Sequence, residues 1–240
     1  MIRDILLAQD FSPSSSRALS YAVDLAERTG ATLHLLHVEE VPLGPLVKGT
    51  PSPISGEEKL LDRFRERCQT LAVADSLDAL DVQYHVQRGD AVAPTVVEVA
   101  EDAAVDLIVM GTQGQRGLQR AFLGSAAREV LRTAPCPVLT TRALPNEEPS
   151  SAPSVERIVV PIDFSDPSRA ALQYTAGLTS VYDVPVKLVH VVEAPTLPAV
   201  YEIESPKIST RKVKARAERT LEEWGGDVLA DHHDVSYVVH

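Results

Sequence analysis

The sequence is poor in the features that mark secreted, membrane-spanning and nucleic-acid-binding proteins. Its two cysteines, Cys68 and Cys136, are too few for a disulfide framework and favour a reducing, intracellular setting. No apolar run approaches the roughly 18 residues of a membrane span, and the amino terminus leads directly into a strand-like run, so we expect no signal peptide. Lys and Arg number 23 against 34 Asp and Glu. The resulting charge of −11 argues against nonspecific binding to nucleic acids or anionic membranes.

Two patterns of catalytic chemistry are also missing from the sequence. It contains no G-x4-G-K-[ST] phosphate loop. Efficient phosphoryl transfer needs a held Mg²⁺, a positioned nucleophile and a cation on the transferred phosphate. His232 and His233 are adjacent, but no other Cys or His lies nearby at a metal-binding spacing, so we expect no metal site. The sequence therefore favours a binding protein over an efficient enzyme.

The most informative pattern that is present is G-x-x-G-x9-G-S, formed by Gly111, Gly114, Gly124 and Ser125. It directly follows the apolar run at residues 105–110, which predicts a buried strand. Glycines allow a tight turn and bring backbone N–H groups close to an anion. We expect a helix with Ser125 as its N-cap, which adds unpaired N–H donors and a positive dipole end. The pattern indicates a phosphate-binding loop; the alternative is a loop whose glycines only serve tight turns.

The chain repeats itself at an offset of 153 residues without a gap. Residues 10–12 (Asp-Phe-Ser) match residues 163–165, and residues 37–38 (His-Val) match residues 190–191. A repeat with an offset of 153 residues, which is the length of a typical domain, predicts two tandem domains of one fold.

The two copies differ in length. We expect a complete domain at residues 1–143, a linker rich in Pro, Ser, Asn and Glu at 144–155, and an incomplete second domain at 156–240. Nothing in the second copy matches residues 89–142, so it lacks the phosphate loop and the last two strands. Because a central strand would be left as an open edge, we expect either a shortened second domain or its completion by another chain.

Apolar runs of strand length alternate with helix-like segments along both copies. The expected strands are residues 5–8, 33–38, 82–86, 105–110 and 138–141, then 158–162, 186–191 and 235–239; the expected helices are 13–29, 57–78, 91–102 and 125–133, then 167–180 and 207–225. This alternation predicts an α/β fold with a doubly wound, five-stranded parallel sheet, followed by a partial copy. Ligands of such sheets bind beyond the carboxyl ends of the strands, where Asp10, Val38 and Gly111 would converge.

The sequence resembles the universal stress protein (UspA-like) family over nearly all of the first copy and the front of the second. The resemblance is carried by residues 5–12, 88–90, 106–114, 123–125 and 134–139. It implies a Rossmann-like fold of the adenine-nucleotide alpha-hydrolase type. Ala8 stands where many members of the family carry Pro.

The resemblance implies that the first domain binds ATP, with or without Mg²⁺. The glycine loop and its Ser would hold phosphate and ribose, Asp10 the adenosine end, and the backbone of Val38 the adenine. The implied nucleotide-binding residues are Ala8, Asp10, Val38, Met110, Gly111, Gln113, Gly114, Gly124, Ser125 and Ala126. Taken alone, Asp10 fits a local cap as well as a ligand role. The second copy keeps the nucleoside side but not the phosphate side, so we expect it to bind no ATP.

The function implied by the resemblance is that of a cytoplasmic, ATP-binding stress-response regulator or chaperone-like factor, with slow ATPase activity at most. One alternative is a nucleotide-handling enzyme of the same superfamily, such as an adenylyl transferase or an ATP hydrolase. Another is an interaction module that binds no nucleotide. We also expect an unidentified protein partner and a homodimer formed through the strand at 138–141.

Overall fold

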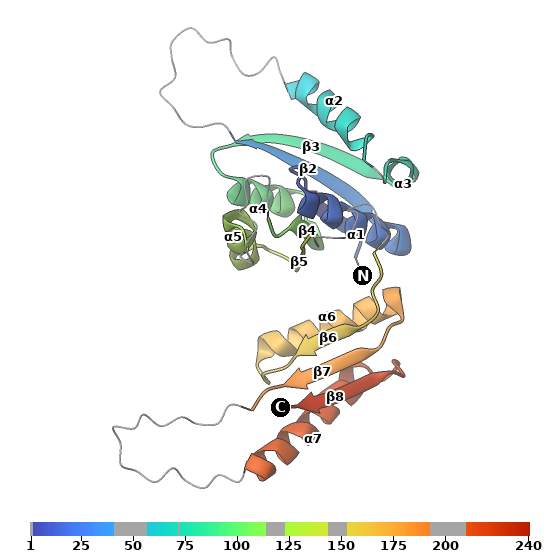
Figure 1. Ribbon diagram of the computed structural model, residues 1–240, viewed down its shortest axis with the longest axis vertical. Coiled ribbons are helices and arrows are strands. Elements are labelled where there is room, and N and C mark those ends of the chain that lie inside the picture. The colour runs from blue at the N-terminus through green and yellow to red at the C-terminus, as the bar shows by residue number, and fades with distance from the viewer. Residues whose placement is uncertain (1, 41–56, 72, 114–122, 144–152, 193–209) are drawn as a thin grey trace, which may run out of the picture. The chain divides into compact units, whose positions relative to one another are not determined.

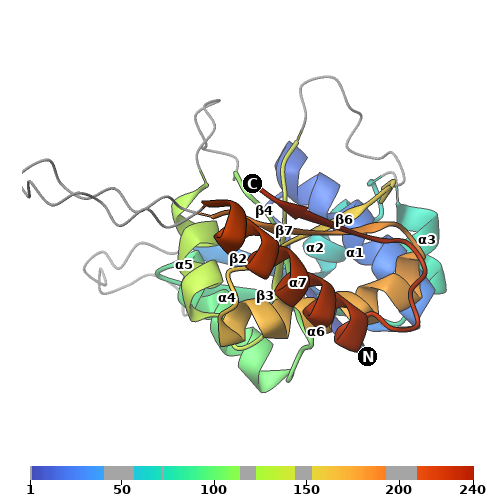
Figure 2. The ribbon, with the colours of Figure 1, turned by 90° about the horizontal axis from the view of Figure 1, so that it is seen from below.

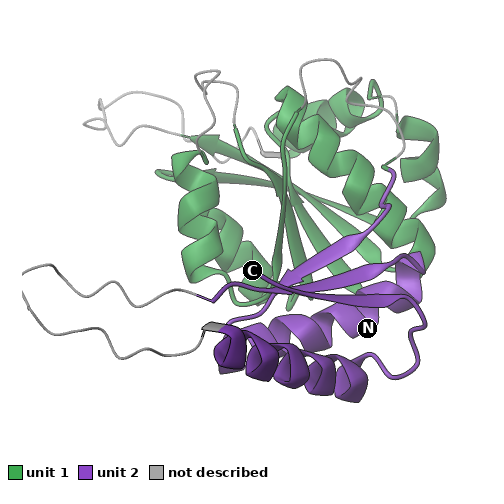
Figure 3. Ribbon diagram, turned by 60° about the horizontal axis from the view of Figure 1, so that its bottom comes forward, with its two compact units in different colours: residues 1–153 green, residues 154–240 purple. Residues whose placement is uncertain are grey.

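The computed structural model describes residues 2–40, 57–71, 73–113, 123–143, 153–192 and 210–240. They form two compact units, residues 1–153 and 154–240, each with its own β-sheet (Figure 3). Most of the expected linker lies outside the described residues.

Unit 1 contains a five-stranded sheet whose strand order is β3-β2-β1-β4-β5 (Figure 1). Every neighbouring pair of strands is parallel. The strands are β1 (Asp4–Ala8), β2 (Thr32–Glu40), β3 (Val82–Gly89), β4 (Leu107–Gly111) and β5 (Val138–Thr141). The chain proceeds outward from β1 to β3 and then returns to the other side of β1, so the topological switch point lies between β1 and β4. This confirms the predicted doubly wound fold.

Helices cover the sheet of unit 1. They are α1 (Pro13–Thr29), α2 (Glu57–Cys68), α3 (Ala74–Ala79), α4 (Val92–Asp102) and α5 (Ser125–Thr133). Residues of α4 and α5 share one apolar cluster with Leu6, Leu36 and Ile108, while α1 packs against β1, β4 and β5. Because successive side chains of a strand point to opposite faces of the sheet, Leu7 and Leu35 lie on the face opposite to Leu6 and Leu36.

The start of α1 follows the prediction. Ser12 is the N-cap and its side chain accepts a hydrogen bond from the Ser15 N–H, while Pro13 occupies the first helical position. Gly30 ends the helix with a φ of 69°, a left-handed conformation that glycine adopts without steric cost.

The prediction of a single helix at residues 57–78 is wrong, because the structure has two helices there, α2 and α3. The hydroxyl of Thr70 donates to the carbonyl of Arg67 at 2.7 Å, and the Leu71 N–H donates to the Cys68 carbonyl at 3.0 Å. These short-range bonds satisfy the last carbonyls of α2 and end it. The sequence pattern indicated the amphipathic face of the helix, but it did not indicate that the Thr70 hydroxyl would bond to a carbonyl of the last turn.

Unit 2 has a three-stranded parallel sheet of order β6-β7-β8. Its elements are β6 (Ile158–Pro161), α6 (Asp166–Tyr182), β7 (Val186–His190), α7 (Thr210–Val228) and β8 (Val235–Val239). Both helices pack on the same face of the sheet, through a core that includes Leu172, Leu188 and Leu221 (Figure 2). The expected partial second copy is therefore confirmed.

The other face of this small sheet differs from its counterpart in unit 1. Val159 is 57% exposed, whereas Leu6, which the 153-residue offset places at the same position, is fully buried. In unit 1 that face carries α4 and α5, and the described part of unit 2 has no corresponding helices.

Candidate functional site

A cavity of about 670 Å³ lies at the carboxyl ends of β1, β2 and β4 and at the start of α5. Nine of the ten residues implied by the family resemblance line it: Ala8, Asp10, Val38, Met110, Gly111, Gln113, Gly124, Ser125 and Ala126. The tenth, Gly114, lies outside the described residues. The fold therefore brings the described set together at the switch point, and its role in nucleotide binding stays a prediction.

The turn between β1 and α1 forms one wall of the cavity. The Oδ1 atom of Asp10 accepts a hydrogen bond from the Ser12 N–H at 2.9 Å. Asp10 thus serves as a local cap, as one of the two sequence interpretations expected, and it also lines the cavity. Between them Phe11 has a φ of 60°, which is a strained conformation for a bulky side chain.

Aromatic and cationic contacts hold this strained turn in place. The ring of Phe11 packs against His37 and Phe64, with centroid distances of 5.8 and 5.9 Å. The guanidinium of Arg67 lies 3.9 Å above the Phe11 ring centroid and lines the cavity as well. The Nδ1 atom of His37 donates to the carbonyl of Gln9 at 2.8 Å, which fixes the end of β2 against the end of β1.

Two glycines of the motif have packing roles that the sequence did not separate from phosphate binding. A Cβ atom on Gly111 would lie 2.7 Å from both the carbonyl carbon of Ser14 and the nitrogen of Ser15. Only glycine therefore allows β4 to approach the first turn of α1 this closely. Gly124 donates its N–H to the Thr112 carbonyl at 2.8 Å, and a Cβ there would lie 3.1 Å from that oxygen.

The expected N-cap role of Ser125 is wrong. Gly124 is the N-cap of α5, because its carbonyl accepts the first helical hydrogen bond, from the Arg128 N–H at 3.0 Å. Ser125 is the first residue of the helix, exposed and on the cavity wall. The first N–H groups of a helix have no partner within it, so α5 presents the N–H groups of Ser125 and Ala126 near the cavity.

The described wall of the cavity is acidic on balance. Asp10, Glu39 and Glu40 line it together with one cationic side chain of the described wall, Arg67. Glu39 is paired with Arg88 from β3, through an Nε to Oε2 distance of 2.8 Å. The negative groups of the cavity wall lie on the side of β1 and β2, and the positive end of the α5 dipole lies on the opposite side of the cavity.

Several polar residues of the cavity wall were not among the site residues expected from the sequence. They are Gln9, Ser12, Ser15, His37, Glu39, Glu40, Arg67 and Thr112. One signal for Gln9 was present in the repeat, since the 153-residue offset places Ile162 at its position. Thr112 lies within the segment 106–114 that carries the family resemblance, but it was not assigned a role, and no spacing or motif pointed to Arg67. Arg116 and Arg120, which belong to the glycine loop, lie outside the described residues.

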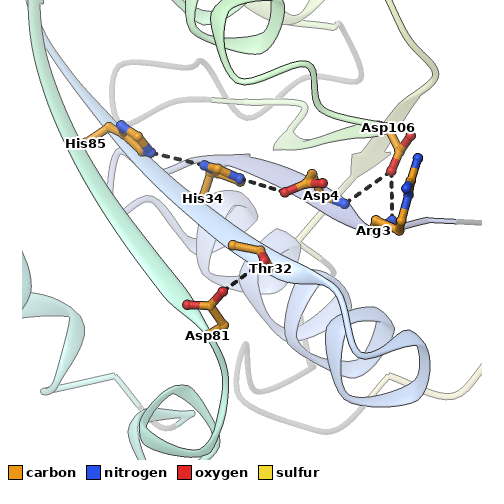
Figure 4. A network of polar contacts seen from close by, with 7 residues as sticks. All are labelled: Arg3, Asp4, Thr32, His34, Asp81, His85 and Asp106. Carbon is orange, nitrogen blue, oxygen red and sulfur yellow. Dashed lines mark hydrogen bonds and ion pairs between the residues drawn. The ribbon is translucent and has the colours of Figure 1, made fainter.

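A second polar network lies at the start of β1 (Figure 4). None of its residues lines the cavity. Asp106 accepts from the N–H groups of Arg3 and Asp4, at 2.7 and 3.2 Å. His34 contacts Asp4 through Nε2 and His85 through Nδ1, each at 3.2 Å. Burial, together with the neighbouring His34, lowers the pKa of His85. These contacts link β1, β2 and β3 with the residue that precedes β4. Among the residues the structure describes, no three metal-ligating side chains converge.

Unit 2 repeats the strained turn. Phe164 has a φ of 63°, and Asp163 accepts from the Ser165 N–H at 2.9 Å. Hydrogen bonds from the side chain and backbone of Ser165 lower the pKa of Asp163 to about 2. His190 donates to the Ile162 carbonyl at 2.7 Å, as His37 does to Gln9. The described part of this unit contains no counterpart of β4 or α5.

Comparisons with known proteins agree with this architecture. The model of the universal stress protein family matches residues 1–142 and 154–240. A universal stress protein of Methanocaldococcus jannaschii is 34% identical over 146 residues, which cover 59% of this chain and 83% of that protein.

Solved structures were compared as well. A universal stress protein from Archaeoglobus fulgidus matches 98% of this chain and 77% of its own, with 18% identity and a TM-score of 0.59, which shows a shared fold. A universal stress protein solved in complex with cAMP matches 60% of this chain and 98% of its own, with 22% identity and a TM-score of 0.42. In the described residues no helix is long and apolar enough to cross a bilayer. The family match covers both units, and the chain belongs to the universal stress protein family.

Proposed function

We propose that unit 1 binds ATP or another adenine nucleotide in its cavity and that the bound nucleotide regulates contact with a partner protein during the stress response. One observation carries the proposal: the strand ends and the start of α5 gather nine of the ten implied residues around one cavity. The volume of about 670 Å³ lies in the usual range for small-molecule sites.

The charges of the wall suggest an orientation for the nucleotide. Its phosphates would lie at the start of α5, where the N–H groups of Ser125 and Ala126 and the helix dipole favour an anion. The carboxylates of Glu39 and Glu40 disfavour phosphate at the end of β2. The adenine would therefore lie on that side, near Val38.

A regulatory role is favoured over an enzymatic one. Efficient phosphoryl transfer needs cations on the transferred phosphate, and the described cavity wall supplies the single guanidinium of Arg67. We expect ATP hydrolysis well below about 1 per second. A faster rate would favour the alternative of a nucleotide-handling enzyme.

Replacing Ser125 with Asp tests the proposal. Ser125 is exposed, and a carboxylate in the first turn suits the helix dipole, so α5 should remain stable. The new charge should repel phosphates, so that the variant loses most of its affinity for ATP and keeps its affinity for adenosine. Isothermal titration of ATP, adenosine and cAMP would measure both effects.

The matched control is Ser180→Asp, which adds the same charge to an exposed position of α6. It should bind ATP as the wild-type protein does. A wild-type protein without saturable ATP binding would contradict the proposal, and so would full ATP affinity in Ser125→Asp.

We also expect a cytoplasmic homodimer that forms through β5. This strand lies at the edge of the sheet of unit 1, so its outer backbone groups are available for pairing with another chain. Sedimentation analysis at micromolar concentration measures the association, and a monomer would contradict it.

A further inference from the structure

Two residues of the cavity wall each carry a buried side-chain atom that has no hydrogen-bond partner among the described residues. These atoms are the Nε2 atom of Gln9 and the Oγ1 atom of Thr112. Gln9 is only 2% exposed, and both residues line the cavity. Leaving a buried polar group unpaired costs about 1–3 kcal/mol, and such groups in native proteins usually have a partner.

Every other hydrogen-bonding group of Gln9 is satisfied. Its backbone N–H donates to Leu36 at 2.8 Å, and its carbonyl accepts from His37 at 2.8 Å. Its Oε1 atom accepts from the Phe11 N–H at 2.9 Å and from the hydroxyl of Ser15. Because an N–H can only donate, the Phe11 contact fixes the orientation of the amide. The unpaired atom is therefore the NH₂ donor.

Thr112 shows the same pattern on the neighbouring strand. Its N–H donates to the Thr141 carbonyl and its carbonyl accepts from the Gly124 N–H, both at 2.8 Å. Only the hydroxyl of Thr112 has no hydrogen-bond partner among the described residues. Since Ala8 pairs with Met110 across β1 and β4, Gln9 and Thr112 follow the ends of two adjacent strands, at the switch point of the sheet.

The repeat in unit 2 shows that the fold does not require a polar side chain at the position of Gln9. Ile162 occupies the equivalent position and makes the same two backbone bonds, to Val189 at 2.8 Å and from His190 at 2.7 Å. Its side chain is buried in the apolar core of unit 2. A glutamine is thus found where the cavity exists, and an isoleucine where the described unit lacks β4 and α5.

We infer that the Gln9 amide and the Thr112 hydroxyl are ligand-binding groups that donate hydrogen bonds to oxygen atoms of the nucleotide. This inference rests on the proposed function. The oxygens belong to the ribose or to the first phosphate, because Gln9 directly precedes Asp10 and the carbonyl of Thr112 accepts from Gly124, the N-cap of α5. Ligand binding would provide the partners that both atoms lack.

Thr112→Val is the most direct test. Valine keeps the shape of threonine and removes only the unpaired hydroxyl, so the stability of the nucleotide-free protein should stay equal or rise. Affinity for ATP should fall by roughly tenfold, the value of one hydrogen bond. Thr112→Ser restores the hydroxyl and should return the affinity to within about twofold of wild type.

Gln9→Glu supplies an independent second variant. The glutamate keeps the Oε1 acceptor for Phe11 and Ser15 and replaces the NH₂ donor with an oxygen. Titration with uncharged adenosine and with ATP separates the lost donor from charge repulsion. A loss of about tenfold for both ligands shows that the lost donor contacts the nucleoside. A loss for ATP alone is what charge repulsion by the new carboxylate produces, and it removes Gln9 as a donor to the nucleoside.

The outcomes distinguish this inference from the proposed function. If the wild-type protein binds neither ATP nor adenosine, both are overturned. If it binds ATP and both variants bind with wild-type affinity, the inference alone is overturned. A loss of ATP affinity in Thr112→Val keeps Thr112 as a ligand-binding group, and a loss of adenosine affinity in Gln9→Glu keeps Gln9; a residue whose variant shows no such loss is removed. Urea unfolding of each nucleotide-free variant shows whether the substitution affected folding.

Discussion

Gly111 belongs to the glycine motif, yet the structure predicts that its replacement acts first on stability. In Gly111→Ala the new methyl group would lie 2.7 Å from the Ser14 carbonyl carbon and the Ser15 nitrogen. Both are backbone atoms, so no side chain can rotate away. The first turn of α1 is also held by the Thr141 hydroxyl, which donates to the Ser14 carbonyl at 3.0 Å.

The cost follows from this lack of space. Real Cβ atoms essentially never approach other heavy atoms closer than 3.0 Å, so α1 and β4 must separate by several tenths of an ångström. Overpacking of this kind costs about 1–3 kcal/mol. With a urea m-value of about 2 kcal/mol per molar, the midpoint of unit 1 should fall by roughly 0.5–1.5 M.

The control is Gly177→Ala in α6. Gly177 is exposed, and a Cβ there meets nothing within 4 Å. Alanine in place of a helical glycine should stabilise unit 2 by about 0.5–1 kcal/mol. The two substitutions are chemically identical and should therefore act with opposite signs on different units.

The assay can separate the units. Trp224 is the single tryptophan and lies in unit 2, so its fluorescence follows that unit, whereas far-UV circular dichroism follows both. Gly111→Ala should lower the dichroism transition and leave the tryptophan transition in place. A Gly111→Ala protein as stable as wild type would refute the packing role. If the prediction holds, loss of nucleotide affinity in this variant says nothing about phosphate contact.

Three further predictions concern other parts of the chain. Leu6→Ala should destabilise unit 1 by about 2–5 kcal/mol, whereas Val159→Ala at the equivalent exposed position should change stability by less than about 0.5 kcal/mol; equal urea midpoints for the two would be inconsistent with their burial. Because burial and His34 lower the pKa of His85 below its usual 6.5, the unfolded chain binds that proton more readily, and stability should fall as pH drops below about 6.5; His85→Gln should reduce this slope in urea titrations at pH 5 and 8, and an unchanged slope would contradict it. Burial raises the pKa of Cys68 to about 12, so iodoacetamide should modify it only after unfolding, and labelling of the native protein at pH 8, detected by peptide mass mapping, would contradict this.

The fold was predictable because its signals are local and repeat along the chain. Apolar runs such as residues 107–110 are buried on both faces, which is typical of a central parallel strand. β2 extends to Glu40 and β3 to Gly89, beyond their predicted ends, because each strand supplies the backbone partner of the other. A sequence pattern cannot show where such pairing stops.

The candidate site was predictable only in outline. The motif located Gly111 and Gly124 at the cavity, but their contacts with Ser14 and Thr112 come from segments far away or across a loop. The N-cap moved from Ser125 to Gly124 because cap position depends on which carbonyl accepts the first helical bond. The unpaired donor of Gln9 becomes visible only once all its other partners are known.

The comparison of the two units separates the demands of the fold from those of a ligand. The left-handed Phe and the His that donates to the preceding strand recur in unit 2, at Phe164 and His190, where the described residues include no β4 or α5. Strain in this turn is therefore a property of the connection between strand and helix and is not evidence for binding. Only features that differ between the copies can carry that argument. Such a difference exists at the position of Gln9, where unit 2 has the apolar side chain of Ile162. The missing partner of the Gln9 amide is therefore better sought in a ligand than in the fold.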